Sequence, residues 1–563
     1  MAVKPVQKAP ATAFCVLAAT LSLATTAAAA PSMAMADDPS TAPASTAVPA
    51  PPLKGVVFLS DAEQARPEGW PALAGGAFDM SRVPALDKPD LAARLQPLLD
   101  RPITDVVTDV TAVASDYFKS IGRPFVSVML PRQALTNGVL QVVVVEARLG
   151  ALKVEGNRWF DERQYLGAMP LAPGETIDAG ALRAGLAQIN RNPFRHAQLV
   201  ANPGATVGAT DLTIRAEERF PLAFTLGADN TGNVPTGRTR LSAGVEWGNA
   251  LWRGDDATYT YITSTDARRL REHVGSYTML LPSGDTLSLS GSRAISRGDA
   301  DGVFSSTGRN SAASVRYTLP LADRPNLKQS VVLGFDYKQA NSDLLFGGAS
   351  VFPTSTDIDQ FVVVYTASWT DGHGGGIDAN ASIVGSPGGL TNGNNDTTFS
   401  TQRSGATARY AYLRVQLNRI TPLPYRLSWF TQATGQFSTS KLLPSEMLAF
   451  GGSQSVRGFN EQTAIRDDGL LLTNELRSPA WSTGLAAGKD RLSAFAFIDM
   501  GLGRNHGDHG SSSTLTMISA GPGLSYQFGA HVSLRLATGF VLHQHGVPGG
   551  KANRPLAGLQ ISF

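Results

Sequence analysis

Cysteine is nearly absent from this sequence of 563 residues. Its single cysteine, Cys15, lies in an apolar run that follows Lys4 and Lys8 and precedes the small residues Ala-Met-Ala at 34–36. This order of segments is typical of a cleaved export signal, so we expect residues 1–36 to be a signal peptide. The run is too short and too rich in alanine to favour the alternative, an anchoring transmembrane helix. Without Cys15 the mature chain has no thiol, which excludes disulfides, cysteine-bound zinc and a cysteine nucleophile.

Long apolar runs are also missing after the signal. No stretch reaches about 18 apolar residues, so a membrane form of this chain would have to be a closed β-barrel rather than a bundle of helices. Charged residues make up only 17% of the sequence and the net charge is +2, which gives no indication of a nucleic-acid partner. Glycine is abundant instead, with 57 residues, and this composition suits strands and turns better than helices.

Motifs of the common enzyme classes are not found either. The sequence has no nucleophile elbow, phosphate-binding loop or dinucleotide fingerprint followed by a helix, so we predict neither an enzyme activity nor a cofactor. Two stretches that contain histidine, at 506–510 and 543–545, could in principle bind a metal. Both fall in or beside expected loops, where polar turn residues are the simpler interpretation, and no metal site is predicted.

The first part of the mature chain has the pattern of small soluble units. Residues 37–52 consist mainly of Pro, Ala, Ser and Thr, so we assign 37–74 to a linker and N-terminal segment. Apolar residues at helical spacing and short strands follow, and the same order of elements returns from about residue 150. We therefore predict two α+β units, at 75–147 and 148–220, each with a strand at the edge of its sheet.

After Pro221 the helical spacing disappears. Segments such as 258–264, 286–292 and 531–543 alternate apolar with polar residues, and about sixteen segments of this kind fill 221–563. Their connections are alternately short and long, as in outer-membrane barrels with tight periplasmic turns and long extracellular loops. A soluble β-sandwich is the alternative, but that fold does not explain why short and long connections alternate. We predict a transmembrane antiparallel β-barrel of about 16 strands at 221–563.

One loop of the expected barrel carries an arginine among glycines and amides. Arg457 lies in the stretch 451–463 after the eleventh strand, between the apolar residues Val456 and Phe459. Simple exposure to solvent is the alternative for an arginine in such a loop. On the thirteenth strand, however, Asp499 alternates with apolar residues and shares the other face of the strand with Phe497. An acid that faces lipid is costly, so the apolar residues are the ones expected to face lipid. Asp499 is therefore expected to point into the lumen and to need a cation.

Five stretches stand in a characteristic order along the chain: 130–150, Asn-Arg-Asn-Pro-Phe-Arg at 190–195, 229–242, Val-Arg-Gly-Phe at 456–459 and Phe-Ile-Asp at 497–499. Together they resemble the two-partner secretion transporters, the ShlB/FhaC/HecB haemolysin secretion/activation family of the POTRA-barrel superfamily. The resemblance covers nearly the whole mature chain. Many relatives carry an N-terminal helix that plugs the pore, but residues 37–52 do not have an amphipathic helical pattern.

The resemblance implies roles for several residues. Residues 443–467, here called the lumenal loop, would fold back into the barrel, where Arg457 would pair with Asp499 and the two phenylalanines would shield the pair. The two α+β units would be POTRA modules, and Phe563 would be the C-terminal signal that the barrel-assembly machinery reads. The residues so assigned are Val456, Arg457, Gly458 and Phe459 in the loop, Phe497 and Asp499 on the wall, and, as a guess for exoprotein binding, Arg132, Gln133 and Leu135.

The function implied is export across the outer membrane. The POTRA modules would lie in the periplasm, capture an unfolded β-rich exoprotein by strand addition and pass it through the barrel to the cell surface. The nearest alternative is a factor of the same superfamily that inserts other barrels into the membrane. A passive porin or an adhesin is a further alternative, but POTRA-like units would be superfluous there.

Overall fold

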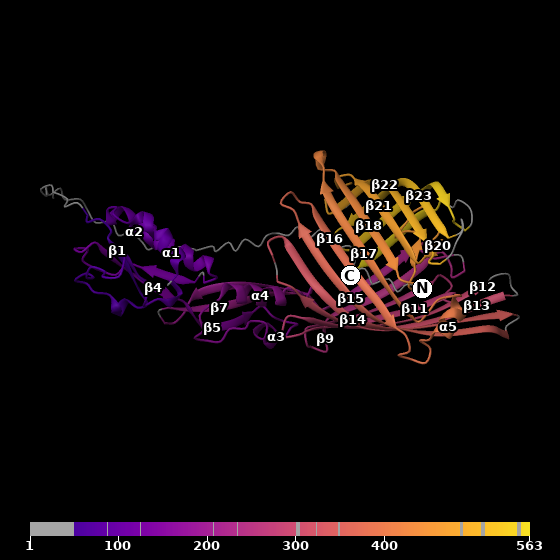
Figure 1. Ribbon diagram of the computed structural model, residues 1–563, viewed down its shortest axis with the longest axis horizontal. Helices are drawn as coiled ribbons and strands as arrows, with labels where there is room; N and C mark the ends of the chain where they lie inside the picture. Colours follow the sequence, from indigo (N-terminus) through magenta and orange to yellow (C-terminus); the bar gives the residue numbers. More distant parts are fainter. Residues whose placement is uncertain are drawn as a thin grey trace.

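The computed structural model describes residues 50–563 except 87, 124, 207, 234, 300–303, 323, 347–348, 485–487, 508–512 and 549–552. The expected signal peptide at 1–36 and most of the linker lie outside the described residues. Figure 1 shows two small α+β units in a row beside one end of a large barrel. The barrel end next to these units is the periplasmic end if the barrel sits in an outer membrane.

The first unit has a sheet in the order β2-β1-β4-β3 with helices packed against it. Strand β1 runs parallel to β4 over five residues, so the sheet begins at Gly55. The boundary expected at residue 75 is therefore wrong, because the buried residues 55–59 belong to this unit rather than to a linker. The elements are β1 (Gly55–Leu59), η1 (Ala62–Gln64), β2 (Phe78–Asp79), η2 (Pro84–Leu86), α1 (Pro89–Leu95), η3 (Gln96–Leu98), α2 (Ile103–Ser120), β3 (Val126–Met129) and β4 (Val139–Glu146).

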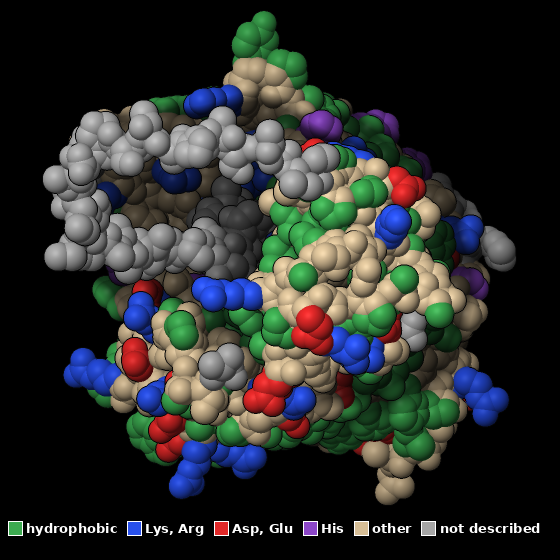
Figure 2. Space-filling view, turned by 90° about the vertical axis from the view of Figure 1, so that its left-hand side faces the viewer, with side chains coloured by type: hydrophobic (Ala, Val, Ile, Leu, Met, Phe, Trp, Pro, Cys, Tyr) green, Lys and Arg blue, Asp and Glu red, His purple; other side chains and the backbone are tan. Residues whose placement is uncertain are grey.

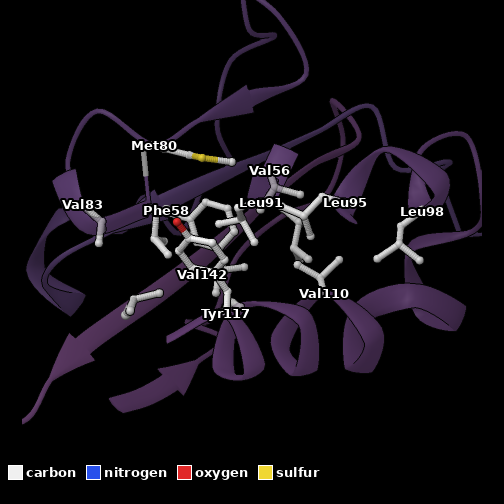
Figure 3. Packing of buried hydrophobic residues seen from close by; sticks show 14 of the residues in the cluster. Val56, Phe58, Met80, Val83, Leu91, Leu95, Leu98, Val110, Tyr117 and Val142 are labelled. Atoms are coloured by element: carbon white, nitrogen blue, oxygen red, sulfur yellow. The ribbon is translucent and has the colours of Figure 1, made fainter. Parts of the chain in front are cut away.

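The core of the first unit lies between its helices and its sheet. The apolar spacing of α2 puts Val106, Val110 and Tyr117 on one buried face. Figure 3 shows Val110 and Tyr117 close to Val56, Phe58 and Val142 of the sheet. Burial of this apolar surface is the main contribution that holds the unit together.

The second unit repeats the plan with a three-stranded sheet in the order β5-β7-β6. Asp161 and Asp178 cap its two helices by accepting hydrogen bonds from the backbone N–H groups of Arg163 and Ala181. Among the described residues, no helix of either unit combines the length and apolarity needed to cross a bilayer. The elements are β5 (Arg148–Glu155), α3 (Glu162–Leu166), α4 (Ala179–Ile189), β6 (Arg195–Pro203) and β7 (Ala209–Glu218).

The remaining strands form one closed antiparallel barrel in which β26 pairs with β8. Strands β24 and β25 are separated by Gly539 alone and both pair with β23, so they make one interrupted strand and the described barrel has 16. Both the fold class and the strand number predicted from the sequence are confirmed. The strands are β8 (Leu222–Asp229), β9 (Arg240–Ala250), β10 (Asp255–Ser264), β11 (Leu270–Leu280), β12 (Thr286–Asp299), β13 (Phe304–Pro320), β14 (Leu327–Phe346), β15 (Ala349–Thr370), β16 (Gly376–Pro387), β17 (Arg409–Pro422), β18 (Ser428–Ser438), β21 (Asp468–Arg477), β22 (Asp490–Arg504), β23 (Thr514–Phe528), β24 (Val532–Thr538), β25 (Phe540–His545) and β26 (Pro555–Ser562).

The period-2 pattern of these strands separates an outer from an inner face. On β15, Phe361, Val363 and Tyr365 are exposed to the outside, whereas Gln360 and Val362 are buried. Apolar residues exposed on the outside of a barrel are explained by contact with lipid. The other elements of the barrel are α5 (Asp396–Gln402), η4 (Pro424–Arg426) and the short strands β19 (Leu448–Phe450) and β20 (Ala464–Arg466).

Candidate functional site

The lumenal loop lies between β18 and β21, the eleventh and twelfth strands of the barrel. It folds on itself, because β19 pairs antiparallel with β20. Its apolar residues Phe450, Val456 and Phe459 are buried in one cluster with Leu515 and Met517 of β23. A loop with this much buried apolar surface is held against the inner face of the wall rather than in solvent.

Arg457 at the tip of the loop is in direct contact with Asp499 on β22. Its Nε and Nη2 donate to the two carboxylate oxygens of Asp499, each at 2.7 Å, and its backbone N–H donates to Oδ2 at 3.0 Å. Arg457 is 4% exposed and Asp499 is fully buried. Such a two-point contact fixes the position of the guanidinium as well as neutralising the acid.

Glu475 on β21 is a second acid in contact with Arg457, and it is not among the residues predicted from the sequence. It accepts from Arg457 Nη1 at 2.6 Å, from Arg535 Nη2 at 2.7 Å and from Arg477 Nη2 at 2.7 Å. Its side chain is 3% exposed. Glu475 could have been predicted as a lumenal residue. It is the cross-strand partner of Phe497, whose face of the strand is expected to point into the lumen. An acid in the middle of a membrane strand obeys the same parity argument as Asp499.

The aromatic residues beside these acids cover the guanidinium groups. The Arg457 guanidinium lies 3.6 Å from the centre of the Phe497 ring, and that of Arg535 lies 4.3 Å from the Phe495 ring. Cation–π contacts of this kind add attraction at a site from which water is excluded. Phe459 lies instead in the apolar cluster of the loop. The cluster of Arg457, Glu475, Arg477, Asp499 and Arg535 is called the lumenal ion cluster below.

Glycines make room for the loop tip on the wall. Gly458 has a φ of +92°, a backbone conformation that other residues rarely adopt, and its backbone lies against Gly539. A Cβ at Gly539 would come within 2.4 Å of the Gly458 nitrogen. The break between β24 and β25 at Gly539 is therefore the place where the loop tip touches the wall.

A second buried contact holds the other end of the loop to a different part of the wall. The carboxylate of Glu446 accepts from Lys338 Nζ on β14 at 2.8 Å and from the Tyr412 hydroxyl on β17 at 3.0 Å. Glu446 is 1% exposed. Strand β14 is the seventh of the barrel and β22 the thirteenth, so the loop is anchored on widely separated sides of the ring.

The three residues proposed for exoprotein binding lie between β3 and β4 of the first unit. Gln133 exchanges hydrogen bonds with the backbone of Gln141, and Leu135 packs against the core of the unit. Their use by an exoprotein stays a prediction. Figure 2 views the molecule from the side of these units and shows basic and acidic side chains interspersed on this face.

Phe563 ends the chain at the seam of the barrel. Its backbone N–H donates to the Phe224 carbonyl at 2.9 Å, and its side chain is 67% exposed.

Among the described residues there is no group of three or more His, Cys, Asp and Glu side chains placed to hold a metal ion.

Comparison with known proteins gives one consistent answer. The family model "Haemolysin secretion/activation protein ShlB/FhaC/HecB" matches residues 208–526, more than half of the chain. The chain is 27% identical to the outer membrane transporter CdiB of Escherichia coli O6:K15:H31 over 462 residues, 78% of this chain and 72% of the relative.

Two solved structures show the same fold. The structure of CdiB from Escherichia coli aligns with a TM-score of 0.71 and 22% identity and covers 93% of each chain. The structure of BamA from Haemophilus ducreyi lacking POTRA domains 1–3 aligns with a TM-score of 0.52 and 14% identity, over 85% of this chain and 98% of that one. The matching family model is that of the haemolysin secretion/activation proteins, which decides between the CdiB kind of barrel and the BamA kind. This chain belongs to the haemolysin secretion/activation protein family of ShlB, FhaC and HecB.

Proposed function

We propose that export of an exoprotein through the barrel depends on the lumenal ion cluster, which holds the lumenal loop in place. As a member of its family, the chain is an outer-membrane transporter of two-partner secretion that exports an exoprotein through its barrel, with its POTRA modules in the periplasm. The observation that carries the proposal is the buried contact of Arg457 with Asp499 and Glu475, which fixes the lumenal loop inside the barrel.

The position of the loop depends on this contact because its loss is energetically costly. Removing one member of a buried ion pair costs about 3–5 kcal/mol, because the other charge stays buried without a partner. The guanidinium of Arg457 serves two acids, so its loss leaves two carboxylates near the two remaining arginines of the cluster. The loop tip then has no defined position on the wall.

Capture of the exoprotein is proposed to occur at the POTRA modules. Each sheet ends in edge strands, β2 and β3 in the first unit and β5 and β6 in the second, and an extended chain could add to such an edge through backbone hydrogen bonds. The segment with Arg132, Gln133 and Leu135 follows β3 and remains our candidate contact. Transport has to be driven without ATP in the periplasm, and we propose that folding of the exoprotein at the surface supplies the direction.

Biogenesis of the barrel is proposed to depend on Phe563 as the signal for the barrel-assembly machinery. Its exposed ring at the end of the last strand is accessible to a partner. Deletion of Phe563 should lower the amount of barrel in the outer membrane severalfold, measured by immunoblot of outer-membrane fractions. Unchanged amounts would contradict this role, whatever the export activity.

The central experiment first determines whether a large exported β-rich protein is encoded next to this chain, and then co-expresses the two. Arg457→Ala and Asp499→Ala should each abolish release of the exoprotein into the medium, while heat-modifiable migration shows that the barrel still folds and inserts. Wild-type release by both variants would refute the role of the contact. Loss of many outer-membrane barrels on deletion of the chain would favour the assembly-factor alternative instead.

A further inference from the structure

The connection between β16 and β17 contains a folded segment at the barrel end away from the POTRA modules. Residues 388–408 carry α5, which Asn395 caps by accepting from the Thr398 N–H at 3.0 Å. Figure 1 places α5 at the opposite end of the barrel from the α+β units. We call residues 388–408 the cap.

The cap covers the free edge of β15 and puts α5 on its lumenal side. The backbone N–H of Asp357 donates to the Gly393 carbonyl at 3.2 Å, and the hydroxyl of Thr356 donates to the Thr398 carbonyl at 3.4 Å. Thr356 lies on the same face of β15 as Gln360 and Val362, the buried face. The helix is therefore seated inside the mouth of the barrel rather than beside it.

The cap and the start of the lumenal loop share one apolar cluster. Phe399 of α5 is fully buried, together with Leu442 and Leu443 and with Tyr410 of β17. This surface joins two segments that are separate connections in the sequence. An apolar contact alone would hold them together loosely, since it has no preferred direction.

A buried ion pair adds a directed contact between the cap and the root of the lumenal loop. Arg403, next to α5, donates from Nη2 to Asp467 Oδ2 at 2.7 Å and from Nη1 to the Leu442 carbonyl at 2.6 Å. Asp467 is fully buried and also accepts from the backbone N–H groups of Leu442 at 2.8 Å and His506 at 2.9 Å. The carboxylate of Asp467 thus accepts hydrogen bonds from the cap, from the start of the lumenal loop and from the connection after β22.

We propose that the cap is latched to the lumenal loop by the Arg403–Asp467 pair, and that the cap and the loop close the extracellular side of the export path as one unit that must open for the exoprotein to leave. This rests on the proposed export function. Three buried pairs then act on the loop: Arg457–Asp499 at its tip, Lys338–Glu446 on the opposite wall and Arg403–Asp467 at its root. Only the third one joins the loop to another connection rather than to the wall.

The latch can be tested by the reactivity of a buried position beneath the cap. Leu443 is 1% exposed, and Cys15 is the only cysteine of the sequence. In intact cells that produce the Leu443→Cys variant with Cys15→Ala, a membrane-impermeant maleimide should react slowly. Adding Arg403→Ala should raise the labelling rate about tenfold or more, because the buried Asp467 is left without its cation and the cap opens.

The matched control is Arg409→Ala. Arg409 is an exposed arginine at the start of β17 whose Nε reaches the Pro387 carbonyl at 3.4 Å, and its loss should leave labelling unchanged. Equal labelling rates for Arg403→Ala and Arg409→Ala would overturn the latch. If Arg403→Ala fails to reach the membrane, Phe399→Ala removes the apolar contact without leaving a buried charge and should raise labelling in the same way.

The proposed function is tested by a separate measurement in the same cells. Co-expression of the exoprotein should raise labelling of Leu443→Cys in the otherwise unaltered chain, because each export event opens the cap. Unchanged labelling in cells that release exoprotein would refute the opening step. If no exoprotein is released at all, the export function fails, while the effect of Arg403→Ala on labelling still decides whether the latch exists.

Discussion

At the scale of single residues, Arg457 uses the shape of its guanidinium as well as its charge. Three nitrogens of the group donate to two carboxylates, Asp499 and Glu475, and the plane of the group lies over Phe497. An ammonium group is a point charge and cannot reproduce this fork. The site therefore selects arginine specifically.

A substitution by lysine tests this selection. Arg457→Lys should reduce release of the exoprotein nearly as much as Arg457→Ala, because one ammonium cannot satisfy both acids. Arg477→Lys is the matched control: Arg477 contacts one acid, Glu475, through Oε2, lies over the Phe430 ring and has a 32% exposed side chain, so a lysine there should retain most of the export. Export assays on both variants at equal barrel levels would check this, and full activity of Arg457→Lys would contradict it.

The parity of membrane strands explains which of these residues could be predicted. Asp499 was found because an acid cannot face lipid cheaply, and the same rule would have found Glu475 on β21. Arg535 and Lys338 were harder to assign, since long basic side chains can reach the membrane surface from several positions. Contacts such as Arg403 with Asp467 depend on how two distant loops fold, and no local pattern encodes them.

At the scale of elements, the fifteenth strand is built around a break at Gly539. The loop tip approaches the wall so closely there that only a residue without a side chain fits, and Gly458 faces it with a positive φ. Phe450 lies in a similar way against Gly469 and Gly503 of β21 and β22, where an added Cβ would come within 2.8 Å of its ring. Glycines on these strands thus provide the seat of the lumenal loop.

Adding one methyl group to this seat should displace the loop. Gly539→Ala should cost about 1–3 kcal/mol of loop packing, since the backbone of Gly458 cannot move without breaking the Arg457 contacts. We expect strongly reduced export with normal heat-modifiable migration of the barrel. Gly372→Ala is the matched control, because an added Cβ there meets no atom within 4 Å. Equal export by the two variants would show that the loop tolerates displacement.

The elements themselves were largely predictable, with exceptions that have physical reasons. Period-2 alternation gave the barrel strands because each has one lipid face and one lumenal face. The seven-residue helix of the cap was not predicted, since its surroundings are rich in Gly, Asn, Ser and Thr and the helix is held by tertiary contacts. The strand at Gly55–Leu59 falls in the segment assigned to the linker and N-terminal segment, because its parallel pairing with β4 could not be seen from its sequence.

At the scale of the whole molecule, the second POTRA module is joined firmly to the barrel. The Phe194 ring packs so closely on Gly248 that a Cβ there would come within 1.9 Å of it, and Asn249 Nδ2 donates to the Trp159 carbonyl at 2.8 Å. Asn192 bridges the two bodies, because its Nδ2 donates to the carbonyls of Gly248 and Gly254 and its Oδ1 accepts from the Phe194 N–H at 3.0 Å.

Buried charge and hydroxyl groups support the module side of this junction. The Arg195 Nε donates to the Ile189 carbonyl at 3.0 Å, and burial lowers the pKa of Arg195 although Tyr165 and Glu218 oppose the shift. Burial also raises the pKa of Tyr165, whose hydroxyl donates to Glu218 at 2.5 Å. The Tyr165 hydroxyl therefore stays protonated at neutral pH and keeps donating to Glu218.

Loosening the junction should separate capture from export. Asn192→Ala removes two hydrogen bonds to the barrel and leaves the Phe194 N–H unpaired, at a cost of about 1–3 kcal/mol. We expect faster proteolytic cleavage between the second module and the barrel, and reduced release of the exoprotein, because a module that swings freely no longer delivers an extended chain to the barrel mouth. Asn202→Ala, at an exposed position of β6, should change neither quantity. Normal export by a chain whose junction has become protease-sensitive would mean that the modules act as tethered receptors rather than as a fixed guide into the pore.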